Sequence, residues 1–219
     1  MEIFSLDRRP VHEQVYDLLR NAILNGEIRP GERLLQDDLA KRFGISRMPI
    51  RDALRLLEAD KLVVSVPNKG FMVSDFGEEE LNDTFFVRSI LEREAVLLAV
   101  PNITEEAVKA LECLVQEMDQ CLEERDLGKL TRLNKEFHSV IYRGVPSQCL
   151  LGIIRNLWDN FPRYAMLSTL ELAEKSQEAH RAILEAIKKG DSVKASRVME
   201  NHILAAGKAY AARKELKGG

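Results

Sequence analysis

Three arginines stand four residues apart in the segment "SRMPIRDALRLLE", which covers residues 46–58. A guanidinium can donate two parallel hydrogen bonds to O6 and N7 of guanine, a contact worth about 1–3 kcal/mol against the wrong base. Residues 41–55 hold five basic side chains and one acidic one, whereas residues 1–75 hold twelve of each. A narrow basic stripe on a neutral body is typical of a nucleic-acid-binding surface, although charge alone also fits a solvated helix face.

A second set of residues capable of chemistry lies in the other half of the chain. His138, His180 and His202 are three of its four histidines, and His180 precedes Gly190 by ten residues while His202 follows Asp191 by eleven. In an antiparallel helix hairpin that turns at Gly190–Asp191, these two histidines reach the same level. Three neutral imidazoles that meet in a helical core suit a divalent transition metal. The alternative is that each is an ordinary hydrogen-bonded histidine.

The segments around the arginines predict two short helices and a turn. The segment "QDDLAKRF" (36–43) is predicted to form a helix that Gly44 terminates. Ser46 is a suitable N-cap for the next helix, and Pro49 is tolerated in its first turn, where amides lack internal partners. The apolar positions of this second helix follow helical spacing and predict its buried stripe: Ile50, Ala53, Leu54 and Leu57. The arginines are thereby left on the outer face of a helix-turn-helix.

A hairpin is predicted directly after this helix. "LVVSV" and "FMVSD" are β-prone runs joined by the turn sequence "PNKG". Its tip carries Asn68, Lys69 and Gly70, which are small or basic groups that can reach phosphates. A hairpin in this position is a wing, so residues 1–75 are predicted to form a winged helix-turn-helix DNA-binding domain.

The rest of the chain, residues 76–219, is predicted to be an all-α bundle. Helical spacing runs from "SDFGEEE" to the C-terminus without β-alternation, and turns are expected near Pro101, Gly144 and Gly190. The predicted fold class is therefore mainly α, with an N-terminal winged helix-turn-helix and a C-terminal helical bundle.

Composition limits the classes of protein that the chain can belong to. The formal net charge is −3, hydrophobic residues make up 45% and charged residues 31%, which is ordinary for a folded globular protein. No apolar run approaches the roughly 18 residues that a membrane span needs, and no signal peptide is apparent. Three cysteines without a CxxC spacing argue against a disulfide framework. We expect a cytoplasmic protein without a membrane partner.

"SRMPIRDALRLLE", with "GERLLQDDLAKRFGIS" before it and "VPNKGFMV" after it, resembles the winged-helix domain of the GntR superfamily of bacterial transcription regulators. The resemblance implies that operator DNA is contacted by Ser46, Arg47, Met48, Pro49, Arg51, Asn68, Lys69 and Gly70. Two residues depart from the family, since members often carry Thr at the position of Met48 and some carry Arg at that of Asp37. One module buries too little surface for tight specific binding, so a homodimer on a palindromic operator is expected.

Three further segments, "LNKEFHSVIYRG", "EAHRAILEAIKKGD" and "MENHILAA", resemble the metal-bearing segments of the FCD (FadR C-terminal domain) branch of that superfamily. The resemblance implies an effector-binding and dimerisation domain whose Asp and three His ligands map to Asn134, His138, His180 and His202. Zinc or nickel is the expected metal, and the neutral amide of Asn134 replaces a charged ligand. In "VRSILE", Arg88 matches an arginine that binds a small organic acid in the family, although an ion pair with Glu92 is the alternative.

The sequence therefore predicts a metabolite-responsive transcription regulator, expected to be a repressor and not an enzyme. The first alternative is a metal-dependent hydrolase that uses the three-histidine site. Against it, no Asp or Glu adjoins any of these three histidines as in HExxH. The second alternative is a DNA-binding protein without an effector.

Overall fold

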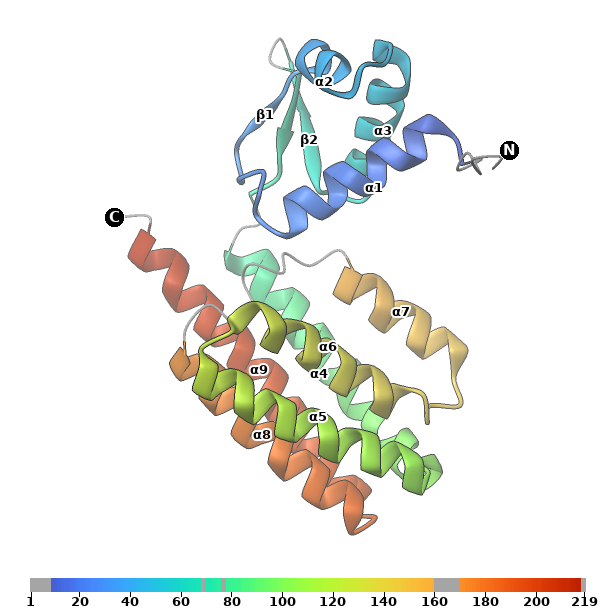
Figure 1. Cartoon of the computed structure of the whole chain (residues 1–219), viewed down its shortest axis with the longest axis vertical. Coiled ribbons are helices and arrows are strands. Elements are labelled where there is room, and N and C mark those ends of the chain that lie inside the picture. The colour runs from blue at the N-terminus through green and yellow to red at the C-terminus, as the bar shows by residue number, and fades with distance from the viewer. Residues whose placement is uncertain (1–8, 68–69, 76–77, 160–169, 218–219) are drawn as a thin grey trace, which may run out of the picture. The chain divides into compact units, whose positions relative to one another are not determined.

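The computed structural model of the chain describes residues 9–67, 70–75, 78–159 and 170–217 (Figure 1). The described residues form two compact units, one of helices and short strands and one of helices only. Each unit is described by itself below. Together they confirm the mainly α fold class that the sequence predicts.

The N-terminal unit is a helical domain with a small antiparallel sheet. Its elements are α1 (Val11–Leu24), β1 (Arg33–Leu34), α2 (Gln36–Phe43), α3 (Arg47–Ala59), β2 (Val63–Val66) and β3 (Gly70–Val73). The strand order is β1-β3-β2, and Val64 lies opposite Met72 in the β2–β3 hairpin. The hairpin agrees with the sequence prediction, whereas β1 was not predicted because two residues carry no periodicity.

The core of this unit lies between α3, α1 and the sheet. All four residues of the predicted stripe on α3, Ile50, Ala53, Leu54 and Leu57, have 0% exposed surface. They pack in one cluster with residues of α1 such as Leu19 and Ile23. Full burial of one aliphatic side chain contributes about 1.5–3 kcal/mol, so this stripe anchors α3 and fixes which of its faces remains in solvent.

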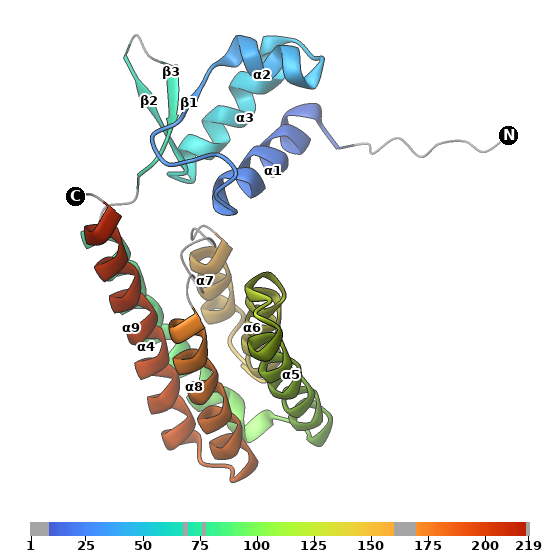
Figure 2. The same ribbon diagram turned by 60° about the vertical axis from the view of Figure 1, so that its left-hand side comes forward.

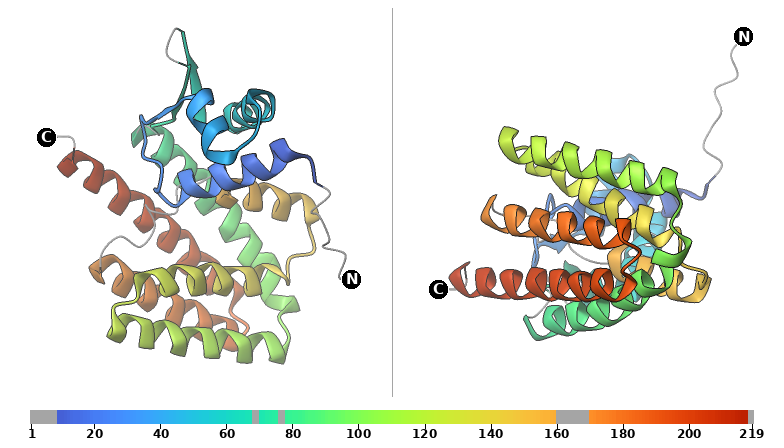
Figure 3. Two further views of the ribbon diagram at one scale, coloured as in Figure 1. Left: turned by 45° about the horizontal axis from the view of Figure 1, so that its top comes forward. Right: turned by 90° about the horizontal axis from the view of Figure 1, so that it is seen from below.

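The second unit is a bundle of long helices. Its elements are α4 (Glu78–Ala99), a 3₁₀ turn (Val100–Asn102), α5 (Glu105–Glu124), α6 (Leu127–Tyr142), α7 (Gln148–Asp159), α8 (Leu170–Lys188) and α9 (Ser192–Lys217). Helix α9 runs along α4 and α8, while α5 packs against α6 and α8 and α7 packs against α4 (Figures 2 and 3). Among the described residues, none of the helices has the length and apolar character that spanning a bilayer requires.

Local signals at the helix ends set the positions of the helices that carry histidines. Gly190 adopts φ 65° between α8 and α9, a left-handed conformation that favours glycine. The carboxylate of Asp191 accepts a hydrogen bond of 2.9 Å from the amide of Lys194 and so caps α9. This tight turn makes α8 and α9 an antiparallel hairpin, as the sequence predicts.

Candidate DNA-binding surface and metal centre

The outer face of α3 is basic and open to solvent. Arg47, Arg51 and Arg55 are all exposed, and 65% of the Met48 surface is accessible. Ser46 occupies the N-cap position with extended backbone, as predicted, but its side chain makes no capping hydrogen bond. Its hydroxyl is therefore not used by the helix end.

Two of these arginines have acidic neighbours. Nε of Arg47 pairs with the carboxylate of Asp37 in the first turn of α2. Nε of Arg51 lies 3.9 Å from a carboxylate oxygen of Asp52, at the limit of an ion pair. Arg47 is therefore tied across the helix-turn-helix, from the first residue of α3 to the start of α2.

The wing is described only at its base. Gly70 begins β3 with φ 79°, a conformation that the hairpin turn requires of it. Asn68 and Lys69, which the sequence places at the tip, lie outside the described residues.

In the helical unit, three histidines from three helices converge. His138 of α6, His180 of α8 and His202 of α9 each offer a ring nitrogen, and these nitrogens all lie within 4.8 Å of one another. The ring centroids are 4.8–5.6 Å apart. His138 and His180 are buried, and His202 is partly exposed. The spacing around Gly190 therefore does bring His180 and His202 together, and His138 of α6 joins them.

Several buried acceptor atoms near the cluster lack a hydrogen-bond partner. Among the described residues, Nε2 of His138, Nε2 of His180 and Oδ1 of Asn134 are buried and unsatisfied. Asn134 lies one helical turn before His138 on α6 and is 4% exposed. A buried polar atom without a partner costs about 1–3 kcal/mol. Two imidazole nitrogens and an amide oxygen are ligand atoms that a divalent transition metal accepts, so these residues fit such an ion.

The tautomer of His180 is fixed by a buried amide. Nε2 of Gln177 donates to the carbonyl of Val115 at 2.9 Å and to Oδ1 of Asp119 at 2.6 Å, both on α5. The amide NH₂ therefore faces α5, and Oε1 of Gln177 faces Nδ1 of His180 at 3.1 Å. Since Oε1 can only accept, His180 is protonated at Nδ1 and its Nε2 lone pair is directed elsewhere.

The tautomer of His138 is fixed by a tyrosine hydroxyl. The hydroxyl of Tyr142 donates to Oε2 of Glu92, so its oxygen accepts from Nδ1 of His138 at 3.2 Å. Burial and the adjacent Glu92 raise the pKa of Tyr142 well above its ordinary value, which keeps the phenol protonated as a donor. His138 thus also presents the lone pair of Nε2.

The three imidazoles are held neutral. Burial lowers the pKa of His138 and of His180 well below the ordinary value, and the neighbouring histidines lower it further. Burial, together with Arg88, lowers the pKa of His202 to about 4. Neutral imidazole is the form that binds a metal, so no proton has to leave these rings when an ion binds at neutral pH.

Next to the histidines lies a buried carboxylate with several donors. Glu92 is fully buried and accepts from Nε of Arg88 at 2.8 Å and from Nε1 of Trp158 at 3.0 Å, in addition to Tyr142. The guanidinium carbon of Arg88 lies 4.5 Å from the ring centroid of Trp158. The ion pair with Glu92 that the sequence left as an alternative is therefore present. Trp158 and Tyr142 were not assigned to the site from the sequence.

Two parts of the chain match the descriptions of known families. Residues 11–73 match bacterial regulatory proteins of the gntR family, and residues 83–205 match the FCD domain. The chain belongs to the GntR family.

Relatives of this GntR-family regulator align over nearly its whole length. It is 32% identical over 209 residues to the uncharacterized HTH-type transcriptional regulator YdhC of Bacillus subtilis, with 94% of this chain and 92% of YdhC covered. It is 30% identical over 214 residues to the HTH-type transcriptional repressor GlaR of Escherichia coli, with 93% and 94% covered. The solved structure of E. coli McbR/YncC superposes with a TM-score of 0.76 at 25% identity, covering 94% of this chain and 99% of that one.

These findings decide whether the chain is a transcription regulator or an enzyme. The chain is a DNA-binding transcription regulator with an FCD domain, and its families and relatives are regulators rather than enzymes. The metal-dependent hydrolase alternative is therefore set aside. The exposed arginines of α3 lie in the part that matches the gntR family, and the three histidines lie in the FCD domain.

Proposed function

We propose that this GntR-family regulator is a metabolite-responsive repressor. Residues 1–75 bind a palindromic operator, and residues 76–219 bind a divalent transition metal with a small organic acid and form the homodimer. The observation that supports binding of the metal and the acid is the convergence of three neutral histidines. In two of them, His138 and His180, a neighbouring group fixes the tautomer and so leaves the lone pair of Nε2 available. GlaR of E. coli and the gluconate operon regulator of Bacillus licheniformis are named repressors, which supports repression of transcription by this chain as well.

DNA recognition is assigned to the exposed face of α3 and to the wing. The proposed operator contacts are Ser46, Arg47, Met48, Pro49 and Arg51 on the helix and Asn68, Lys69 and Gly70 on the wing. Arginines can read guanine, and the exposed thioether of Met48 suits a thymine methyl group. The wing residues mainly position the domain on the phosphate backbone.

The proposed metal ligands are Asn134, His138, His180 and His202, and the proposed ion is zinc or nickel. A bound ion would supply a concentrated positive charge to which an acid can bind as a further ligand. All four ligands are neutral, so nothing in the set offsets the charge of a divalent cation. An anionic effector is the natural completion of such a site.

Arg88 is proposed to add its charge to the binding of the acid. It is 1% exposed, and its guanidinium is held between Glu92 and the ring of Trp158. A buried, planar cation favours a carboxylate nearby. An acid that binds one arrangement of these helices more tightly than another shifts the population of the domain, and the shift couples to operator affinity.

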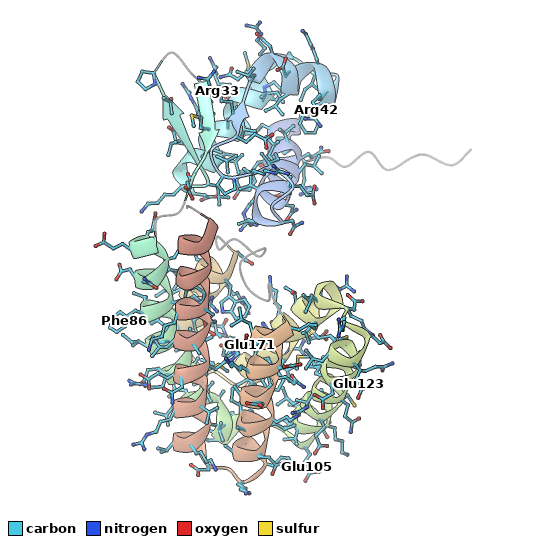
Figure 4. All side chains as sticks on the ribbon, turned by 90° about the vertical axis from the view of Figure 1, so that its left-hand side faces the viewer. Arg33, Arg42, Phe86, Glu105, Glu123 and Glu171 are labelled. Carbon is cyan, nitrogen blue, oxygen red and sulfur yellow. The ribbon has the colours of Figure 1, made fainter. Side chains whose placement is uncertain are left out.

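The proposed dimer surface is the outer face of α4. Phe86, Val87, Ile90 and Leu98 are exposed there at 55%, 39%, 37% and 41%. Figure 4 shows Phe86 projecting from this helix away from the other helices of the unit. A long helix that leaves several large apolar side chains in solvent suits burial against a second copy, which a palindromic operator also requires.

Elemental analysis and native mass spectrometry of the chain as purified test the metal proposal. We expect about one equivalent of zinc or nickel per chain, lost in the double variant H138Q/H180Q and retained in H12Q, which removes the histidine outside the cluster. A metal content unchanged in the double variant would contradict the proposed ligands.

A further inference from the structure

A cavity of about 290 Å³ lies between α6 and α7, beside the histidine cluster. Its lining includes His138, Tyr142 and Trp158, which are buried, and the apolar side chains of Leu151 and Ile154. The volume is close to the lower end of known ligand sites, about 300–1,000 Å³. The cavity therefore suits a small ligand with an apolar middle, and one of its walls carries a proposed metal ligand.

The mouth of this cavity has an excess of positive charge. Lys135, Arg143 and Arg155 line it together with one acid, Asp159, which gives a net charge of +2 (three minus one). Lys135 pairs with Asp159 at 3.2 Å. Within the described part of the chain, no acidic group lies within ion-pair distance of Arg143 or Arg155. A concave site with uncompensated arginines concentrates anions.

We propose that the acid effector carries a second anionic group, which Arg143 and Arg155 bind at the mouth of the α6–α7 cavity. This inference rests on the proposed function, since it assigns the first carboxylate to the metal side of the cavity. Guanidinium groups bind carboxylate and phosphate alike, so a dicarboxylic acid and a phosphorylated acid are both of the inferred class. A monocarboxylate would leave the two arginines without an anion.

Calorimetric titration of the zinc-loaded full-length chain tests this. The probes are the monocarboxylates propionate, butyrate and pentanoate, the dicarboxylates malonate, succinate and glutarate, and phosphoglycolate. We expect the best dianion to bind about tenfold or more tighter than a monocarboxylate of equal chain length, because charge-assisted hydrogen bonds are strong. Comparison of phosphoglycolate with succinate, which has the same number of chain atoms, distinguishes a phosphate from a second carboxylate.

Variants locate the second anionic group. R143Q and R155Q should remove most of the dianion preference and leave monocarboxylate affinity unchanged. R132Q, an exposed arginine of α6 outside the cavity lining, should change neither. Monocarboxylates that bind as tightly as dianions would overturn the inference and leave the proposed function intact. Failure of every acid to bind would overturn both.

A second inference concerns DNA recognition and rests on a different contact. Asp37 takes Nε of Arg47 as its partner, which directs the guanidinium and leaves the two Nη groups for another ligand. Those two groups form the fork that matches O6 and N7 of guanine. The geometry points to Asp37 as a positioning residue that holds the Nη groups of Arg47 in the orientation needed to read a guanine.

Selection of duplexes from a randomised library by the full-length chain tests this without knowledge of the operator. In D37N we expect the guanine preference at one position of each half-site to fall about five- to tenfold, with an unchanged dependence of affinity on salt. D38N is the control, because Asp38 also lies in the first turn of α2 and is exposed. Tighter binding of D37N to every duplex, with a steeper salt dependence, would show that Asp37 merely repels phosphate and would overturn the inference.

Discussion

Nδ1 of His180 lies 3.1 Å from Oε1 of Gln177, the residue one turn earlier in α8. Because Nε2 of the same amide donates to Val115 and Asp119 of α5, the orientation of the imidazole depends on how α5 packs against α8. Nδ1 of His138 is fixed by a different route, through Tyr142 and Glu92. The proposed metal ligands are therefore held by groups that belong to the bundle itself.

Replacement of Gln177 should weaken metal binding without unfolding the domain. In Q177M the imidazole of His180 loses its acceptor and its fixed tautomer, and we expect zinc affinity to fall about 10- to 100-fold. Competition with a chromogenic chelator measures this. Q120M removes an exposed amide of α5 that donates to Glu124 and serves as the control. Equal zinc affinity in Q177M and the parent chain would contradict the positioning role.

The metal-free chain should lose stability as the pH falls from about 6.5. The folded-state pKa values of His138, His180 and His202 lie below the ordinary value, to about 4 for His202. The unfolded chain therefore binds more protons in this range, and unfolding becomes easier by up to about 1.4 kcal/mol per pH unit for each histidine. Urea unfolding in chelator at several pH values measures the slope. If the free energy of unfolding depends on pH equally steeply in H138Q/H180Q, the imidazoles of the folded chain are not held neutral by burial.

Two substitutions on α3 should separate recognition from stability. R51A removes an exposed side chain, so the unfolding free energy should stay within about 0.5 kcal/mol while operator affinity falls. L57A empties a fully buried position and should cost about 2–5 kcal/mol of stability. Chemical unfolding and fluorescence anisotropy with promoter DNA give the two quantities. Unchanged DNA affinity in R51A would refute the assignment of this face.

A charge on the outer face of α4 should prevent dimer formation. I90E places a carboxylate among the exposed apolar residues of the proposed interface, which include Phe86 and Val87. Sedimentation velocity should show a monomer, whereas V193E, at an exposed apolar position of α9, should behave as the parent chain. A dimer that persists in I90E would place the interface elsewhere.

Local sequence patterns accounted for the elements but not for all of the contacts. The stripe from Ile50 to Leu57 was predictable because helical spacing alone decides which side of α3 is buried. The meeting of His180 and His202 was predictable because they are nearly symmetric about Gly190, whereas His138 was placed with them only through the family resemblance. In contrast, Trp158 meets Glu92 across 66 positions of sequence, and that contact depends on how α7 packs on α4. The strand β1 is too short to leave a periodic signal.

The most direct test is an anisotropy titration of the chain against DNA from its own promoter region, with and without zinc and with the acid that the zinc-loaded chain binds most tightly. We predict that this acid changes DNA affinity at least about fivefold in the zinc-loaded chain. The change should vanish in H138Q/H180Q and after chelation. An equal response of the metal-free chain, or no response to any acid that the zinc-loaded chain binds, would contradict metal-dependent control of DNA binding.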